Sequence, residues 1–141
     1  MLQRLAHYSI RVSDLATSKR FYTEVLGLEV GARPPFGFPG AWLYLADEDV
    51  AGQGVVHLIH AGSGEALDTY LGGRPNTEGR TCALDHIAFF ASDWPGFEQK
   101  LKGADVRFVE RFVPLLGVRQ VFLTDPDGVV IELNFAEPAR S

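Results

Sequence analysis

The segment Ala83–Ser92 reads ALDHIAFFAS, an apolar run that carries a single histidine, His86. Its residue types are those of a β-strand. The earlier segment Leu5–Ser13, LAHYSIRVS, has the same plan, since His7 also lies near the start of a strand-like run. In both segments a Ser-Asp pair begins six residues after the histidine. We infer that one structural unit occurs twice in this chain.

The remaining sequence predicts the same order of elements in both halves. Each Ser-Asp pair precedes a segment with helical spacing, and its side-chain oxygens can accept hydrogen bonds from the first free backbone N–H groups. We expect Gly27 and Gly103 to end these two helices. Three further strand-like segments follow in each half. The expected strands are residues 5–12, 28–33, 41–46 and 53–60 in the first half, and 83–91, 105–111, 117–124 and 129–135 in the second.

These elements predict an α+β fold of two tandem βαβββ modules. Because no helices separate the successive C-terminal strands of each half, we expect mostly antiparallel sheets. A chain of 141 residues has the size of one domain. We place module one at about residues 1–61, a linker at 62–81 and module two at 82–137. The linker is rich in glycine and is expected to contain one helical turn near Glu65–Tyr70.

Composition argues against several classes of partner. The formal net charge is −5 and the basic residues are scattered, so we expect no nucleic-acid partner. No run of apolar residues is long enough to cross a membrane, and the N-terminal residues do not resemble a signal peptide. We therefore expect a cytoplasmic protein. The single cysteine, Cys82, is expected to act as a small core residue.

Four metal-ligating residue types occur in strand-like, largely apolar segments. Each half supplies one of them from its first strand and one from its last strand; they are His7, His57, His86 and Glu132. If a pseudo-twofold axis relates the halves, all four converge near that axis. Three imidazoles and a carboxylate suit one divalent ion such as Fe, Zn, Ni, Mn or Co, and suit Ca²⁺ or Mg²⁺ poorly. Four ligands on an octahedral ion leave two positions for a substrate that binds through two oxygens.

Each of the four residues also has a structural interpretation. A histidine on a half-buried strand is usually part of the packing, and Glu132 could pair with Arg11 or Arg119. A carboxylate in an apolar strand is costly unless it is paired or coordinated, however, which favours the metal. If one histidine stays unbound, the remaining two with Glu132 make the facial triad of non-haem iron enzymes.

Four further residues are candidates for substrate binding. Arg11 shares a strand face with His7 and could hold a substrate carboxylate or form a salt bridge. Trp42 and Tyr44 share one face of their strand and belong either to the core or to the wall of a pocket for an aromatic group. Of the neighbours Arg119 and Gln120 only one can face the cleft, and we expect Gln120 to do so.

The sequence resembles the vicinal oxygen chelate superfamily, which includes glyoxalase I, extradiol ring-cleavage dioxygenases and the fosfomycin and bleomycin resistance proteins. The resemblance covers nearly the whole chain. It rests on HYSIRVSDL at His7–Leu15, FYTEVLGL at Phe21–Leu28, LDHIAF at Leu84–Phe89 and FLTDPDGVVIEL at Phe122–Leu133.

The resemblance implies that the two modules' sheets curve into an open, barrel-like cleft, that His7, His57, His86 and Glu132 bind the metal, and that the protein is a homodimer. Arg11 matches an arginine that helps to bind glutathione in glyoxalase I. One position departs from that enzyme, which carries a glutamate where this chain has His57. The substitution raises the expected charge of the loaded site to about +1 and favours anionic enolate or catecholate ligands.

Two classes of function follow from these residues. The first is a metal-dependent enzyme that binds a small substrate through two oxygens, with Glu132 as the candidate base, and catalyses either glyoxalase-I-like isomerase or lyase chemistry or ring cleavage by a dioxygenase. The second is a metal-free protein of the bleomycin-resistance kind that sequesters a ligand. The four-ligand set favours the enzyme, and a purely structural zinc is disfavoured because such sites are rich in cysteine.

Overall fold

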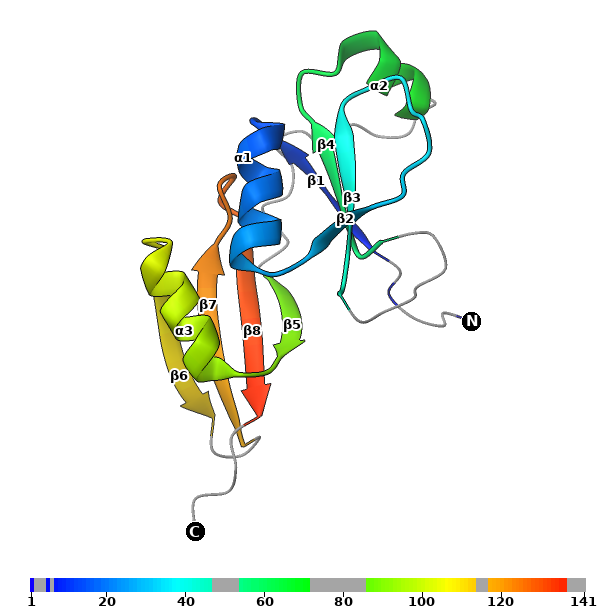
Figure 1. Cartoon of the computed structure of the whole chain (residues 1–141). Helices are drawn as coiled ribbons and strands as arrows, with labels where there is room; N and C mark the ends of the chain where they lie inside the picture. The colour runs from blue at the N-terminus through cyan, green and yellow to red at the C-terminus, as the bar shows by residue number, and fades with distance from the viewer. Residues whose placement is uncertain (2–4, 6, 47–53, 72–85, 114–116, 137–141) are drawn as a thin grey trace. The chain divides into compact units, whose positions relative to one another are not determined.

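The structure is a computed structural model that describes residues 1, 5, 7–46, 54–71, 86–113 and 117–136. In this part of the chain the strands form two four-stranded sheets, one in each half (Figure 1). The chain divides into two compact units, Met1–Thr81 and Cys82–Ser141. Cys82 itself, whose core position the sequence predicts, lies outside the described residues.

The first module combines one mixed sheet with a helix that changes its winding. Its strands are β1 (Tyr8–Val12), β2 (Glu29–Gly31), β3 (Gly40–Tyr44) and β4 (Val56–His60), in the order β1-β4-β3-β2. Between β1 and β2 lie α1 (Leu15–Arg20) and a π-helical turn, η1 (Phe21–Val25). A third helix, α2 (Gly64–Leu71), follows β4. Only β1 and β4 pair in parallel within this sheet.

The second module repeats this plan. Its strands are β5 (Ile87–Ala91), β6 (Phe108–Val113), β7 (Val118–Thr124) and β8 (Val130–Ala136), in the order β5-β8-β7-β6, with α3 (Trp94–Gly103) after β5. Again only the first and last strands pair in parallel. The prediction of two βαβββ modules with mostly antiparallel sheets is therefore confirmed.

Two boundaries differ from the expectation in the same way. The described parts of β1 and β5 begin at Tyr8 and Ile87, so His7 and His86 each lie one residue before a strand. In addition, α2 has two turns where the composition of the linker predicted one. Leu67 of α2 is buried against Phe38 and Ile59, and such tertiary packing stabilises a helix that propensity alone disfavours.

Aspartates cap the two main helices. Asp14 Oδ1 accepts from the Thr17 N–H at 2.8 Å, and Asp93 Oδ1 accepts from the Gly96 N–H at 3.2 Å. Hydrogen bonds from Thr17 lower the pKa of the Asp14 carboxyl. At the other end of the first helix Gly27 adopts a φ of +79°, as expected for a terminating glycine. After α3 it is Asp105, with a φ of 54°, that takes the left-handed conformation instead of Gly103.

One face of each sheet packs on its own core. In the first module the apolar positions of β1, β3 and β4 that alternate with the candidate site residues are buried together with Tyr22 and Val25 of η1; they are Ile10, Val12, Ala41, Leu43, Val56 and Leu58. In the second module α3 covers the corresponding face, where the rings of Trp94 and Phe97 lie 5.3 and 5.7 Å from the ring of Phe135. The opposite face of each sheet carries the candidate site residues.

We expect Leu101→Ala to lower the free energy of unfolding by about 2–5 kcal/mol, because Leu101 of α3 is fully buried and its truncation leaves a cavity. Urea denaturation followed by circular dichroism measures the change. The matched control is Gln99→Ala, an exposed position of the same helix, which should change stability by no more than about 0.5 kcal/mol. Equal effects of the two substitutions would contradict the assigned core.

Candidate functional site

The first module holds its two candidate histidines in a stack of rings. His57 lies on β4, where its register partners are Ser9 on β1 and Trp42 on β3. The His57 ring is stacked on the His7 ring at a centroid distance of 3.8 Å and on the Trp42 ring at 4.2 Å. His57 is only 7% exposed. The neighbouring strands therefore fix this imidazole in both position and tilt.

An aromatic cluster extends the stack away from His57. It consists of Phe36, Phe38, Trp42 and Tyr70, with ring centroids 4.8–6.1 Å apart in the contacting pairs. Arg33 lies over Phe36 and Phe38 and donates to the Phe38 carbonyl oxygen at 2.9 Å. Partial burial lowers the pKa of its guanidinium. Phe36 and Phe38 lie in the loop between β2 and β3, and their rings thus join β3, which carries Trp42, to helix α2.

In the second module a buried carboxylate, Glu132 on β8, is the centre of the candidate site. It is 7% exposed. Its Oε1 accepts from Gln120 Nε2 at 2.7 Å and from Asn134 Nδ2 at 2.8 Å. Its Oε2 lies 2.9 Å from His86 Nε2. The two oxygens therefore have different surroundings, with one held by amides and the other facing an imidazole.

Arg111 of β6 fixes the orientation of the Gln120 amide. Its Nε donates to Gln120 Oε1 at 2.8 Å, so the amide nitrogen must point the other way. That nitrogen donates both to Glu132 and to Asn134 Oδ1, the latter at 3.1 Å. We call Arg111, Gln120, Glu132 and Asn134 the Glu132 network. It positions the carboxylate through a chain of hydrogen bonds that crosses three strands.

Sequence reasoning missed two members of this network, Arg111 and Asn134. Asn134 lies two residues beyond Glu132 on β8, so the alternation of a strand would have placed it on the same face. Arg111 becomes a candidate only once its register with Gln120 is known. The sequence predicts strands but not which residues of β6 and β7 pair.

The remaining predicted residues lie as follows. Gln120 shares a face with Glu132, whereas Arg119 pairs with Glu110 at 2.7 Å and lies over Trp94 on the opposite face. The Tyr44 hydroxyl donates to the Ala32 carbonyl oxygen at 2.5 Å, which holds that ring against β2. Arg11 is half-buried on β1, with Ile59 as its register partner. The substrate-binding roles of Arg11, Trp42, Tyr44 and Gln120 stay predictions.

The second module places two potential ligand atoms at a separation that suits one ion. Two ligands on neighbouring corners of an octahedron with bonds of about 2.1 Å lie about 3 Å apart, and the His86 and Glu132 atoms are separated by 2.9 Å. In the first module the rings of His7, which precedes β1, and His57 on β4 are stacked at a centroid distance of 3.8 Å. In the described part of the chain no group of three His, Cys, Asp or Glu side chains is found. The convergence of the two pairs on one ion stays a prediction.

Comparison with known proteins decides the family. Residues 4–133 match the model of the Glyoxalase/Bleomycin resistance protein/Dioxygenase superfamily. The chain belongs to this superfamily. The expected resemblance is thereby confirmed over most of the sequence.

Relatives in this glyoxalase superfamily include enzymes with named reactions. The chain is 31% identical to Glyoxylase I 4 of Arabidopsis thaliana over 94% of its own length and 70% of the relative. It is 30% identical to a probable lactoylglutathione lyase of Vibrio parahaemolyticus, covering 92% and 88% of the two chains. These likenesses support an enzyme of the superfamily.

A solved structure from Frankia sp. EAN1pec, a glyoxylase/bleomycin resistance protein/dioxygenase domain, has the same fold. Its TM-score is 0.66 at 23% identity, and the match covers 99% of this chain and 96% of that one. Among the described helices of this glyoxalase-superfamily chain, none is long and apolar enough to span a membrane.

We predict that Gln120→Leu lowers the free energy of unfolding by about 1–3 kcal/mol, because the buried Glu132 carboxylate and Arg111 each lose a hydrogen-bond partner. Urea denaturation checks the value. Gln99→Leu, at an exposed position of α3, is the matched control. A loss no greater than that of the control would show that the Glu132 network contributes nothing to stability.

Proposed function

We propose that this chain is a divalent-metal-dependent enzyme that binds a small substrate through two oxygens and moves a proton on it, in the manner of glyoxalase I. The observation that carries the proposal is the state of Glu132. A buried carboxylate has two amide donors on Oε1 and an imidazole beside Oε2. Such an arrangement suits a carboxylate that must be held in position while one of its oxygens binds an ion or exchanges a proton.

Four residues of this chain would hold the ion, His7 and His57 from the first module and His86 and Glu132 from the second. Three imidazoles and one carboxylate favour Fe, Zn, Ni, Mn or Co. A divalent ion bound there supplies Lewis-acid polarisation of the two substrate oxygens. The Trp42 ring and the amides of Gln120 and Asn134 hold His57 and Glu132 in orientation, as neighbouring side chains commonly do for metal ligands.

The proposed reaction is an intramolecular proton transfer. Glu132, which would act as the base when it is not bound to the ion, removes the proton from a hydroxyl-bearing carbon next to a carbonyl group, and the electron pair of that C–H bond moves toward the carbonyl oxygen. The hydroxyl proton passes to that oxygen, the electron pair of the O–H bond forms the new carbonyl group, and Glu132 returns its proton to the neighbouring carbon. Nothing is oxidised from outside and no co-reactant is consumed. The amide donors on Oε1 hold the carboxylate in place, and Oε2 would exchange the proton when it is not bound to the ion.

Substrate binding is assigned to residues on the same sheet faces. Arg11 would bind a substrate carboxylate, Trp42 and Tyr44 would form an aromatic wall, and Gln120 would contribute an amide. The relatives named glyoxylase I and lactoylglutathione lyase support the isomerase or lyase class. His57 stands where glyoxalase I has a glutamate, and the resulting positive site favours an anionic form of the substrate. We expect a cytoplasmic homodimer.

We expect Glu132→Ala and His86→Ala each to abolish tight binding of the ion, because each substitution removes one of the two metal ligands proposed in the second module. Equilibrium dialysis against Ni²⁺ and Zn²⁺ with elemental analysis measures the stoichiometry. Circular dichroism should show an intact fold.

Matched controls are Glu98→Ala, a glutamate on α3 that pairs with Lys102, and His60→Ala, a histidine of β4 that lies three residues from His57 and points to the opposite face of the sheet. Both should retain one ion per chain. Stoichiometric metal in both Glu132→Ala and His86→Ala would refute the ligand assignment, and no binding by the unaltered chain would favour the ligand-sequestering function.

Glu132→Gln should lower kcat by about 10²–10⁴-fold at equal metal content, because it removes the base. The assay uses the hemithioacetal of methylglyoxal and glutathione with the Ni²⁺-, Co²⁺- or Zn²⁺-loaded chain under nitrogen, and Glu98→Gln is the control. Activity that instead requires Fe²⁺, O₂ and a catechol would contradict proton transfer and indicate a ring-cleavage dioxygenase.

A further inference from the structure

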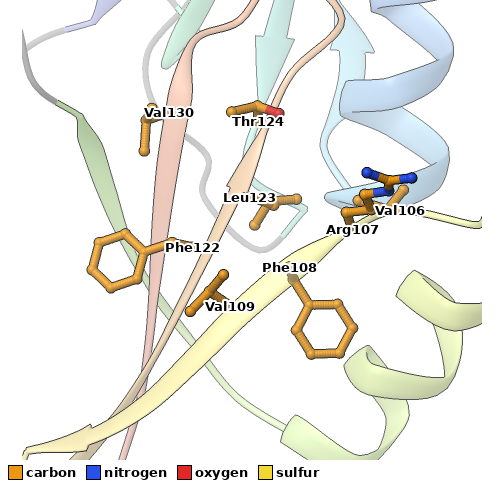
Figure 2. A pocket seen from close by; sticks show the side chains of 8 residues that line it. All are labelled: Val106, Arg107, Phe108, Val109, Phe122, Leu123, Thr124 and Val130. Carbon is orange, nitrogen blue, oxygen red and sulfur yellow. The ribbon is translucent and has the colours of Figure 1, made fainter.

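A mostly apolar pocket of about 670 Å³ opens on the second module. Figure 2 shows the eight side chains that line it, which come from β6, β7, β8 and the two residues before β6. Its volume lies within the range of pockets that bind small molecules. None of its lining residues belongs to the Glu132 network, so the proposed chemistry leaves this space unassigned.

Strand pairing places four of the eight lining residues on the face that carries Glu132, whereas Phe108 and its register partner Leu123 point to the opposite face. Phe122 is the register partner of both Glu132 on β8 and Val109 on β6, and Thr124 is the partner of Val130. Direct partners in a sheet point to the same side. The pocket residues Val109, Phe122, Thr124 and Val130 therefore lie on the face that carries Glu132.

Phe122 links the two regions directly. Its ring meets the His86 ring edge-on at a centroid distance of 6.0 Å, and Arg111 lies over it at 5.2 Å. Adjacent strands are about 4.8 Å apart, so the backbones of Glu132 and Val109 are separated by about 10 Å. A ligand whose two oxygens bind an ion held by His86 and Glu132 would reach the pocket across Phe122.

The charged member of the lining is Arg107, which immediately precedes β6 and is exposed. It lies two residues, or about 7 Å of strand, from Val109. Phe122, Val109 and Val130 offer apolar contact, and Arg107 offers a cation at the far side. These groups complement a molecule with an apolar body and an anionic end.

The geometry points to a second substrate subsite in this pocket, which takes the apolar body of the substrate and pairs a distal carboxylate or other anion with Arg107. The substrate class is then an amphiphilic acid that has its two chelating oxygens at one end and its anion at the other. This inference rests on the proposed function, since it places the chelating oxygens at Glu132 and His86.

Three hydroxamates test the subsite, because a hydroxamate binds a metal through two oxygens. Acetohydroxamate carries the chelating group alone, octanohydroxamate adds an apolar chain, and suberic monohydroxamate adds a terminal carboxylate to that chain. Isothermal titration with the Ni²⁺-loaded full chain gives the three dissociation constants. We expect octanohydroxamate to bind about tenfold more tightly than acetohydroxamate or better, since one buried methylene is worth a factor of about four.

Two variants locate the effect. Val109→Gln should remove most of the gain from the apolar chain while leaving acetohydroxamate binding unchanged. Arg107→Gln should weaken suberic monohydroxamate by about twofold to fivefold, as expected for an exposed ion pair, without changing octanohydroxamate. Matched controls are Val30→Gln and Arg20→Gln, both exposed positions of the first module, which should match the unaltered chain.

The outcomes separate the two proposals. If acetohydroxamate binds and the longer chain adds nothing, or if Val109→Gln and Val30→Gln behave alike, the subsite is refuted and the metal site stands. If Arg107→Gln binds suberic monohydroxamate as tightly as the unaltered chain does, the proposed pairing of an anionic substrate end with Arg107 is refuted. If none of the three hydroxamates binds the loaded chain, the proposed function fails and the subsite fails with it.

Discussion

The parallel pairing of the first and last strands within each module is the constraint on which the rest of the structure depends. Parallel neighbours need a long crossover connection, and here the helix and two intervening strands supply it. The pairing places Ser9 beside His57 and Ala88 beside Glu132. A shift of one residue would turn these side chains to the opposite face and bring core residues to the site. Backbone register thus sets the face of the sheet on which His57 and Glu132 lie.

Contacts of different kinds restrain two buried polar residues, His57 in the first module and Glu132 in the second. His57 is enclosed by the rings of His7 and Trp42, so contact with flat surfaces restrains it. Glu132 has a charge to satisfy, and two amides and an imidazole surround it. Stacked rings restrain the orientation of an imidazole, whereas a buried carboxylate needs hydrogen-bond donors. The exchange of glutamate for histidine between the halves therefore involves the neighbours as well as the ligand itself.

The sequence predicts most of the architecture for two reasons. The same order of elements occurs twice, and the signals that define each element, namely strand alternation, the aspartate caps and Gly27, are local. The face of Gln120 follows from parity with Phe122. Register is not local, so the role of Arg111, which depends on pairing β6 with β7, was out of reach. The length of helix α2 does not follow from its own sequence, because the helix is stabilised by packing of Leu67 against Phe38 and Ile59, which lie outside the helix. Whether Trp42 belongs to the core or to a pocket also depends on such contacts, here with His57 and Phe36.

The π-helical turn η1 has a consequence for how the two halves correspond. The C-cap Leu26 lies twelve positions after Asp14, whereas Ala104 lies eleven positions after Asp93. In an α-helix one extra residue rotates everything beyond it by about 100°, which would carry buried positions out of the core. The wide turn, closed by the Leu26 N–H to Phe21 oxygen hydrogen bond, absorbs the residue and keeps Tyr22 and Val25 inside. An alignment of the two halves over these helices therefore needs a gap of one residue, and that gap belongs within Phe21–Val25.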